Sequence, residues 1–186
     1  MRVSASGRGR QGDAASGLHG LAISDDGRVV AFDSYASNLV AGDTDQCHEL
    51  RDRGQEGGCS DVFVRDRQAG TVEQMDVSSA GEPAEGESRT ILDSLSGDGR
   101  FVVFETDAAN LVSGGYWCSW RYSDRTCSDV YVRDRAAGTT ERVSARLSCQ
   151  PDPGQPNLCY DGDPGAESAA DSGGGEISAD GRFVAF

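Results

Sequence analysis

One pattern of apolar and polar residues occurs three times along the chain. It consists of an apolar residue and Ser, one variable residue, Asp-Gly-Arg and then four apolar residues, at 23–32, 95–104 and 177–186. Asp-Gly between two apolar runs predicts a tight hairpin turn, because Gly adopts a positive φ angle without strain. We therefore interpret the chain as a repeat protein.

Each repeat predicts four short strands separated by turn residues. The first unit, 20–78, has expected strands at 21–24, 28–34, 60–67 and 72–77. The second unit, 92–145, has expected strands at 92–96, 100–106, 128–135 and 140–145. Residues 2–5 have the same sequence as 142–145 and are expected to be the last strand of a preceding unit, while 174–186 begin a third. Residues 6–19 and 146–173 are expected to be connections.

Several of these strands are continuously apolar rather than alternating. Residues 62–64 are Val-Phe-Val and 101–104 are Phe-Val-Val-Phe. A strand with this pattern is covered on both of its faces, whereas antiparallel sheets normally leave one face in water. Radial stacking of small sheets covers both faces, so the pattern favours an all-β, propeller-like arrangement of four-stranded antiparallel blades.

The repeat resembles the WD40-like PD40 repeat of TolB-type β-propellers. The resemblance is carried by Ile-Ser-x-Asp-Gly-Arg-Phe-Val-Ala-Phe, Ala-x-Asn-Leu-Val-x-Gly-Asp, Asp-Val-Phe-Val-Arg-Asp-Arg and Gly-Thr-Thr-x-Arg-Val-Ser. It implies a ring of six or a similar number of blades in an exported bacterial protein, which binds proteins or ligands more often than it catalyses. The chain itself is expected to hold two full blades and parts of two others, an incomplete ring whose partners include the remaining blades of the parent propeller.

Charge narrows the possible partners. The formal net charge is −14, and all 17 basic residues are Arg. Such an acidic chain is a poor partner for nucleic acid or anionic membranes. No apolar run approaches the roughly 20 residues of a membrane span, and the first ten residues lack the apolar core of a signal peptide.

Six cysteines fall into three local couples, each inside a polar, turn-rich insert. The couples are Cys47 with Cys59, Cys118 with Cys127, and Cys149 with Cys159. Six cysteines allow 15 pairings, and nearest-neighbour pairing is favoured because each disulfide would staple its own loop. The cysteines indicate an extracellular or periplasmic location, with the export signal upstream of Met1.

Metal chemistry has two candidate sites. Asp43, Asp45 and Asp61 offer oxygen ligands to Ca²⁺, although the loop lacks the Gly and terminal Glu of a twelve-residue calcium loop. A solvated acidic turn is the alternative. Cys47-His48 with Cys59 does not have the usual spacing of zinc ligands, so we expect a disulfide beside an exposed His.

The other charged motifs have structural interpretations. Asp26, Asp98 and Asp180 are expected to accept hydrogen bonds from the backbone of their own turns. The Arg-Asp-Arg triplets at 65–67 and 133–135 are expected to form cross-strand and inter-blade ion pairs. No Gly-x-Ser-x-Gly elbow and no Lys is present, so no catalytic residue is predicted.

Four aromatic residues gather inside the second cysteine insert: Tyr116, Trp117, Trp120 and Tyr122. An exposed aromatic cluster can bind a sugar or a protein partner, and the alternative is that it forms the core of its own loop. We expect a non-enzymatic scaffold without a cofactor that binds a protein or carbohydrate partner through disulfide-stapled loops. The alternatives are an accessory propeller of a hydrolase or peptidase whose catalytic domain lies outside this chain, and a calcium-dependent surface or adhesion protein.

Overall fold

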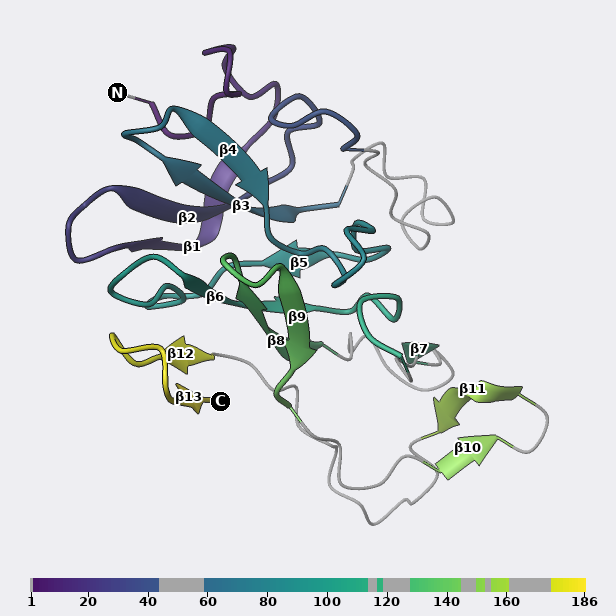
Figure 1. The fold of residues 1–186 in the computed structure, drawn as a ribbon. Helices are drawn as coiled ribbons and strands as arrows, with labels where there is room; N and C mark the ends of the chain where they lie inside the picture. The colour runs from purple at the N-terminus through teal and green to yellow at the C-terminus, as the bar shows by residue number, and fades with distance from the viewer. Residues whose placement is uncertain are drawn as a thin grey trace.

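The protein is built from small antiparallel β-sheets that stack on one another (Figure 1). The computed structural model describes residues 2–43, 59–113, 128–144 and 175–186, and the backbone of 117–118, 150–152 and 155–160. The described residues contain no helix, and so none that could span a membrane. The fold is therefore all-β, as the sequence predicts.

Two four-stranded meanders form most of the described structure. The first sheet has the order β1 (Ser16–Ile23), β2 (Val29–Ser34), β3 (Asp61–Asp66) and β4 (Thr71–Gln74). The second sheet has the order β5 (Ser88–Arg89), β6 (Phe101–Thr106), β8 (Asp129–Asp134) and β9 (Thr139–Arg142). A two-stranded third sheet holds β12 (Glu176–Ile177) and β13 (Val184–Ala185). A side sheet has the order β10 (Gln150–Asp152), β11 (Gln155–Tyr160) and β7 (Trp117–Cys118).

The first two sheets have the same strand register. In the first sheet, Val29 is opposite Asp66 and Ser34 is opposite Asp61. In the second sheet, Phe101 is opposite Asp134 and Thr106 is opposite Asp129. Residue 29 therefore corresponds to 101, an offset of 72, and residue 61 corresponds to 129, an offset of 68. The repeat in the sequence is thus a repeat in the structure.

The short turns lie at one edge of the sheets, which we call the turn edge. The Ser-x-Asp-Gly-Arg segments join β1 to β2 and β12 to β13, and they lead into β6. In each segment the Asp side chain accepts a backbone N–H two residues later, at 2.9, 2.9 and 3.1 Å for Asp26, Asp98 and Asp180. Hydrogen bonds from the neighbouring Ser hydroxyl and from this N–H lower the pKa of all three carboxyls. The predicted turn role of these residues is confirmed.

The long connections lie at the opposite edge, which we call the loop edge. The chain leaves β2 and β6 there, enters β3 and β8 there, and passes from β4 to β5 there. The described ends of both cysteine inserts that interrupt a meander, at 43 and 59 and at 113 and 128, lie at this edge. The tight turns and the ends of the long connections therefore lie at opposite edges of the sheets.

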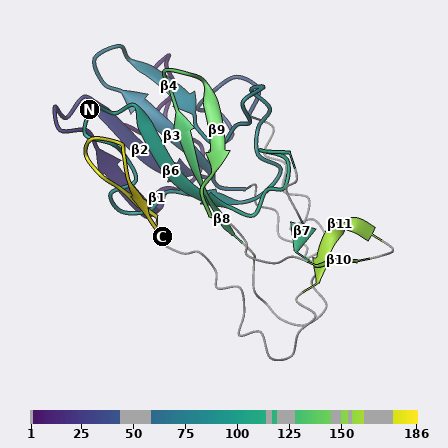
Figure 2. The same cartoon turned by 60° about the horizontal axis from the view of Figure 1, so that its bottom comes forward.

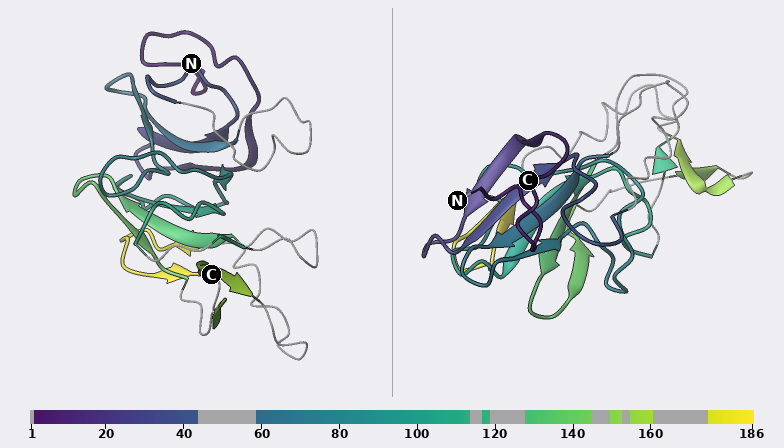
Figure 3. Two further views of the ribbon diagram at one scale, coloured as in Figure 1. Left: turned by 90° about the vertical axis from the view of Figure 1, so that its right-hand side faces the viewer. Right: turned by 90° about the horizontal axis from the view of Figure 1, so that it is seen from above.

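Side chains cover both faces of the second sheet. Toward the first sheet, Val102, Phe104 and Tyr131 pack with Val29 and Val64 in one core cluster. Toward the third sheet, Val103 and Val130 pack with Ile177. Figure 3 shows the sheets as successive layers. The continuous apolar runs therefore belong to strands that are buried on both faces, as their pattern predicts.

Aromatic residues stack between neighbouring strands within each sheet. Phe32 on β2 stacks on Phe63 on β3 at 5.9 Å between ring centroids, and Phe104 on β6 stacks on Tyr131 on β8 at 5.7 Å. Both pairs are direct register partners. Cross-strand aromatic pairs of this kind stabilise sheets and fix the register.

Successive sheets are also joined by backbone contacts at the turn edge. The N–H of Asp25 donates to the carbonyl of Gly97 (2.9 Å), and the N–H of Gly97 donates to the carbonyl of Ala179 (2.8 Å). These three residues occupy the variable position of the three Ser-x-Asp-Gly-Arg segments. The hydrogen bonds therefore form one ladder across all three sheets.

The predicted ion pairs are present in part. Asp66, Asp134 and Arg135 of the two triplets form ion pairs, whereas Arg65, Arg67 and Arg133 donate to the backbone carbonyls of Ala5, Gly27 and Ser78. Arg28 pairs with Asp66 at 2.7 Å, and Arg100 pairs with Asp134 at 2.6 Å, each across two strands of one sheet. The guanidinium of Arg28 holds the pKa of Asp66 well below its usual range, and Arg100 lowers the pKa of Asp134 to about 2. Arg135 of the second sheet pairs with Glu73 of the first at 3.1 Å.

The structure differs from the predicted elements in several places. Residues 92–96 are not a strand: β5 ends at Arg89, Asp93 has a φ of 55°, and only Leu95 forms an isolated bridge, with Val102. Residues 2–5 have only the bridge from Ala5 to Gln11, because this segment folds back on its own chain. β1 begins earlier than predicted, and the expected connection 146–173 includes β10 and β11.

Candidate functional site

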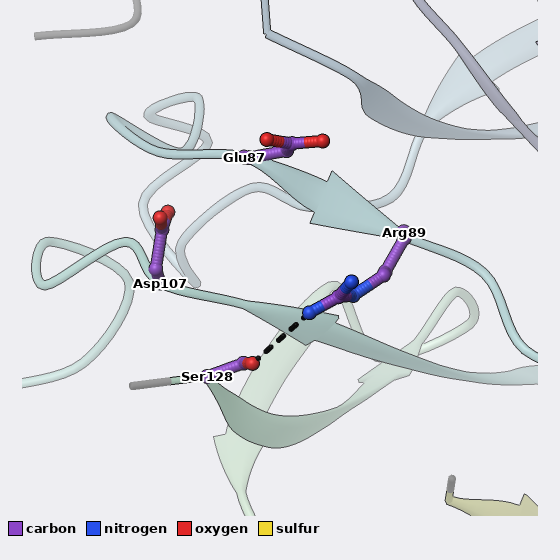
Figure 4. Close-up of a pocket in the computed structure, with 4 residues that line it drawn as sticks. All are labelled: Glu87, Arg89, Asp107 and Ser128. Carbon is purple, nitrogen blue, oxygen red and sulfur yellow. Dashed lines mark hydrogen bonds between the residues drawn. The ribbon is translucent and has the colours of Figure 1, made fainter. Parts of the chain in front are cut away.

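A pocket of about 180 Å³ opens at the loop edge where the second sheet begins. It is lined by Glu87 and Arg89 around β5, by Asp107 just after β6, and by Ser128 just before β8 (Figure 4). Three segments that are distant in the sequence meet here because β5, β6 and β8 are adjacent in the sheet and each has an end at this edge. The pocket presents carboxylate acceptors on one side and a guanidinium and a hydroxyl on the other.

Arg89 is held in a fixed position by two contacts. Its Nε pairs with the buried carboxylate of Glu105 at 3.0 Å, and its Nη2 donates to Ser128 Oγ at 3.3 Å. Glu105 lies on β6 directly opposite Arg89 in the register. Because the pair is cross-strand, the guanidinium is oriented before any ligand arrives.

Glu87 connects the pocket to the first sheet. Its Oε1 accepts a hydrogen bond from the hydroxyl of Tyr35, which follows β2, at 2.8 Å. Burial, together with this hydrogen bond to a carboxylate, raises the pKa of Tyr35 to about 12. The tyrosine therefore remains a neutral donor at physiological pH, and it fixes Glu87 relative to both sheets.

The first sheet carries a different arrangement at the position that corresponds to Glu105. Here Asp33 is fully buried and accepts the N–H groups of Leu18 and His19, each at 3.2 Å, and the Nδ1–H of His19 at 3.0 Å. Thr90 of the second sheet lies 3.1 Å from the same carboxylate. The β1 register shifts between Ser16 and Leu21, which brings these backbone donors to one oxygen pair. The site is saturated with donors, so we assign it a structural role that ties the two sheets together.

Two carboxyl groups, those of Asp61 and Asp76, lie together at the start of β3. Asp76 is fully buried, accepts the N–H of Val62 at 3.2 Å, and lies against the carboxyl of Asp61. Burial raises the pKa of Asp76, although hydrogen bonds from Ser88 and Asp61 partly oppose the shift. At the corresponding position of the second sheet, Ser144 accepts the N–H of Val130 and donates to Asp129, both at 2.9 Å.

Most of the residues that the sequence predicts as binding, metal or disulfide sites lie outside the part of the chain that the structure describes. Asp45, Cys47, Tyr116, Trp120, Tyr122, Cys127 and Cys149 lie outside the described residues, and for Trp117, Cys118 and Cys159 only the backbone is described. Asp43 and Asp61 are described, and Gln74 donates to Asp61 at 3.1 Å. Within the described ranges, no three His, Cys, Asp or Glu side chains are grouped to hold a metal ion. The calcium site therefore stays a prediction.

Three of the six cysteines lie in the described part of the chain, two of them with the backbone alone. Cys59 is buried and disulfide-bonded, and its partner lies outside the described residues. In the side sheet, β7 lies beside β11 (Figure 2), and the backbone of Cys118 is the parallel register partner of Cys159. The local pairings stay predictions, and this register adds a pairing that sequence spacing did not suggest.

Sequence reasoning missed the pocket, although a signal was present. Asp33 and Glu105 are acidic residues in otherwise apolar strands, at corresponding positions of the two repeats. A carboxylate at such a position needs dedicated donors, and the search for them leads to Arg89.

A scan of family models finds no match to this chain, and a search of curated proteins finds none either.

Proposed function

We propose that the chain is a non-enzymatic binding scaffold: a segment of a β-propeller from an exported protein that binds a protein or carbohydrate partner through its loop edge. The stacked four-stranded meanders, with tight turns at one edge and long inserts at the other, support the propeller interpretation. The cysteines of the inserts, with Cys59 disulfide-bonded, support export.

The observation that carries the proposal is that three of the four pocket residues have no similar counterpart in the first repeat. Glu87, Arg89 and Asp107 correspond to Ala15, Gly17 and Tyr35 in the first repeat. The residues that build turns, ladders and core recur in both repeats, so they are the ones that the fold requires. Glu87 and Asp107 do not recur, whereas Ser128 recurs as Ser60 and Arg89 also serves the buried Glu105. Glu87 and Asp107 are therefore the charged residues of the pocket that the repeat can be built without, and a ligand explains them better.

The chemistry of the pocket suits a ligand rich in hydroxyl groups. Glu87 and Asp107 can accept hydrogen bonds, while Arg89 and Ser128 can donate them. Sugar hydroxyls both donate and accept hydrogen bonds. A pocket of about 180 Å³ is smaller than most small-molecule pockets, so it would take no more than a single ring. A carbohydrate, or a glycan on a partner protein, would place one ring in the pocket and the remainder against the loops.

The test is binding of the chain to an array of immobilised glycans, followed by titration with the soluble form of any glycan that binds. Glu87→Gln and Asp107→Asn keep the shape of the pocket and should each weaken binding at least tenfold, because each replaces a charged acceptor that a sugar hydroxyl would use. The exposed Glu141→Gln is the matched control and should bind normally. Unchanged binding by both pocket variants would reject the pocket as the site, and no binding to any glycan would reject the carbohydrate form of the proposal.

A further inference from the structure

The charges that line the pocket at the loop edge are not balanced. Glu87 and Asp107 place two carboxylates on one side of it, and Arg89 places a guanidinium on the other (Figure 4). The charge of Arg89 is engaged behind the pocket, where its Nε pairs at 3.0 Å with Glu105, whose side chain is 5 % exposed. Arg89 and Glu105 neutralise each other, so the lining presents a negative charge to a ligand.

Comparison of the two repeats supports this division of the charges. In the first repeat, Gly17 takes the place of Arg89, and Asp33 takes the place of Glu105. Backbone N–H groups of β1 donate to Asp33, each at 3.2 Å. The guanidinium of Arg89 serves the buried Glu105 in the same way, so the fold accounts for it. The two pocket carboxylates have no acidic counterpart in the first repeat.

The carboxylate of Asp107 occupies a space that the backbone leaves open. A Cβ on Gly86 would overlap with Oδ1 of Asp107, so only glycine at position 86 admits this side chain. The first repeat has Ala14 and Tyr35 at the two corresponding positions, so both residues differ together. The backbone N–H of Asp107 also donates to the carbonyl of Glu87 at 3.3 Å, which holds the two acidic segments side by side.

The carboxylate of Glu87 is oriented without being neutralised. Its Oε1 accepts a hydrogen bond from the uncharged hydroxyl of Tyr35 at 2.8 Å. Two oriented carboxylates on one side of a pocket favour a ligand with a positive charge. Hydrogen bonds between a cationic donor and a carboxylate are roughly twice as strong as those between neutral groups.

The opposite side of the pocket restricts what kind of cation fits. The remaining N–H groups of Arg89 and the hydroxyl of Ser128 are donors, so the ligand needs acceptors within one ring's width of its positive charge. A lysine side chain carries its ammonium at the end of an apolar stem and offers no such acceptor. An amino sugar carries an ammonium group and several hydroxyl groups on one ring.

We propose that the pocket binds an amino sugar whose amino group is free and positively charged. The ammonium lies between Glu87 and Asp107, and ring hydroxyls accept hydrogen bonds from Arg89 and Ser128. The inference rests on the proposed function, because it names the class of sugar that the same pocket takes. The chain charge of −14 also attracts a glycan made of several such units.

The test is isothermal titration calorimetry of the whole chain with three short oligosaccharides of the same length and linkage, made of glucosamine, N-acetylglucosamine or glucose. The measurements are made at about 0.15 M salt, where the screening length is about 8 Å and distant charges on the chain contribute little. The glucosamine oligomer should bind about tenfold or more tightly than the other two, because only it forms hydrogen bonds with a cationic donor.

Two isosteric variants locate the preference. Glu87→Gln and Asp107→Asn should each reduce the preference for the glucosamine oligomer, and the double variant should bind all three oligosaccharides with similar affinity. Glu141→Gln removes one negative charge from an exposed residue of β9 and should keep the full preference. A lysine oligomer of the same charge should bind about tenfold more weakly than the glucosamine oligomer, because it lacks the hydroxyl groups.

The outcomes separate this inference from the proposed function. Equal binding of the three oligosaccharides by the unmodified chain would overturn the inference and leave the proposed function standing, whereas binding to no glycan at all would overturn both. A preference that the double variant retains would show that the overall charge of the chain causes it, and would also overturn the inference. Equal or tighter binding of the lysine oligomer would overturn the assignment to a sugar. If a variant fails to fold, as circular dichroism would show, the three oligosaccharides still decide on the unmodified chain.

Discussion

Replacing Asp76 by Asn is expected to stabilise the protein at neutral pH. Asp76 is fully buried beside a second carboxyl, that of Asp61, while the second sheet uses Ser144 at the same place. A serine can accept the strand N–H and donate to the neighbouring carboxylate at once, whereas an ionised aspartate can only accept. Asn keeps the acceptor for Val62 and adds a donor toward Asp61.

The pH dependence follows from the raised pKa of Asp76. Burial is the main cause, so the folded chain holds this proton at pH values where the unfolded chain, with a pKa near 3.8, has released it. Stability from this group is therefore fully present well below pH 3.8 and is lost as the pH rises through the raised pKa. The magnitude follows from the cost of a poorly satisfied buried group, about 1–3 kcal/mol. We expect Asp76→Asn to recover about 1–3 kcal/mol at pH 8, equivalent to roughly 2–10 °C in melting temperature.

The assay is urea unfolding of the two proteins at pH 8 and at pH 3.5. The advantage of Asp76→Asn should be present at pH 8 and largely disappear at pH 3.5, where aspartate carries its proton in both states. Glu141→Gln removes one exposed negative charge and controls for the reduced repulsion in a chain of charge −14. A variant that is less stable at pH 8, or equally advantaged at both pH values, would contradict the assignment of a costly buried ionisation.

Three further outcomes are expected. Gly99→Ala should destabilise the chain more than Gly138→Ala. Both glycines have a φ near 70°, which costs an L-residue about 1–2 kcal/mol, but only at Gly99 does the new Cβ press on the first sheet. Equal losses of stability in urea unfolding would show that the contact between Gly99 and the first sheet contributes nothing. Asp134→Asn should cost about 1 kcal/mol at pH 7. Because an arginine lowers the pKa of Asp134 to about 2, its contribution is present above pH 3.8 and fades as the pH falls through about 2, so a loss of stability that is the same at pH 7 and pH 1.5 would argue against the ion pair. Mapping of non-reduced peptides should decide whether Cys118 forms a disulfide with Cys127 of its own loop or with Cys159, its register partner. A peptide that joins Cys118 to Cys159 would rule out the local pairs Cys118–Cys127 and Cys149–Cys159.

The middle strands of each meander could be predicted from the sequence because their residues are apolar without interruption. β2, β3, β6 and β8 each lie within one residue of their predicted bounds. Burial on both faces requires that pattern, and few other environments tolerate it. The turns could be predicted equally well. Asp-Gly after Ser favours one tight turn, and the hydrogen bonds that Asp26 accepts from Ser24 and from the N–H of Arg28 belong to that turn.

The first strand of the second sheet could not be predicted, because tertiary contacts decide it. Residues 92–96, Leu-Asp-Ser-Leu-Ser, occupy the place of the first strand in the repeat, yet Asp93 takes a left-handed conformation and its carbonyl accepts the N–H of Ile177 at 3.1 Å. The packing of the third sheet thus overrides the local preference. The pocket escaped prediction for a similar reason: Glu87, Asp107 and Ser128 are separated in the sequence, and only the adjacency of three strands brings them together.

The two offsets between the repeats have a consequence for how such a chain can change. The offset falls from 72 to 68 between the second and third strands, and yet every residue pair across those strands is retained. A difference of four residues is therefore absorbed entirely within the connection at the loop edge. Lengthening or shortening that connection leaves the sheets intact, so peptide tags or foreign recognition segments grafted there should be tolerated. A residue added within a Ser-x-Asp-Gly-Arg turn would instead displace that turn's rungs of the backbone ladder.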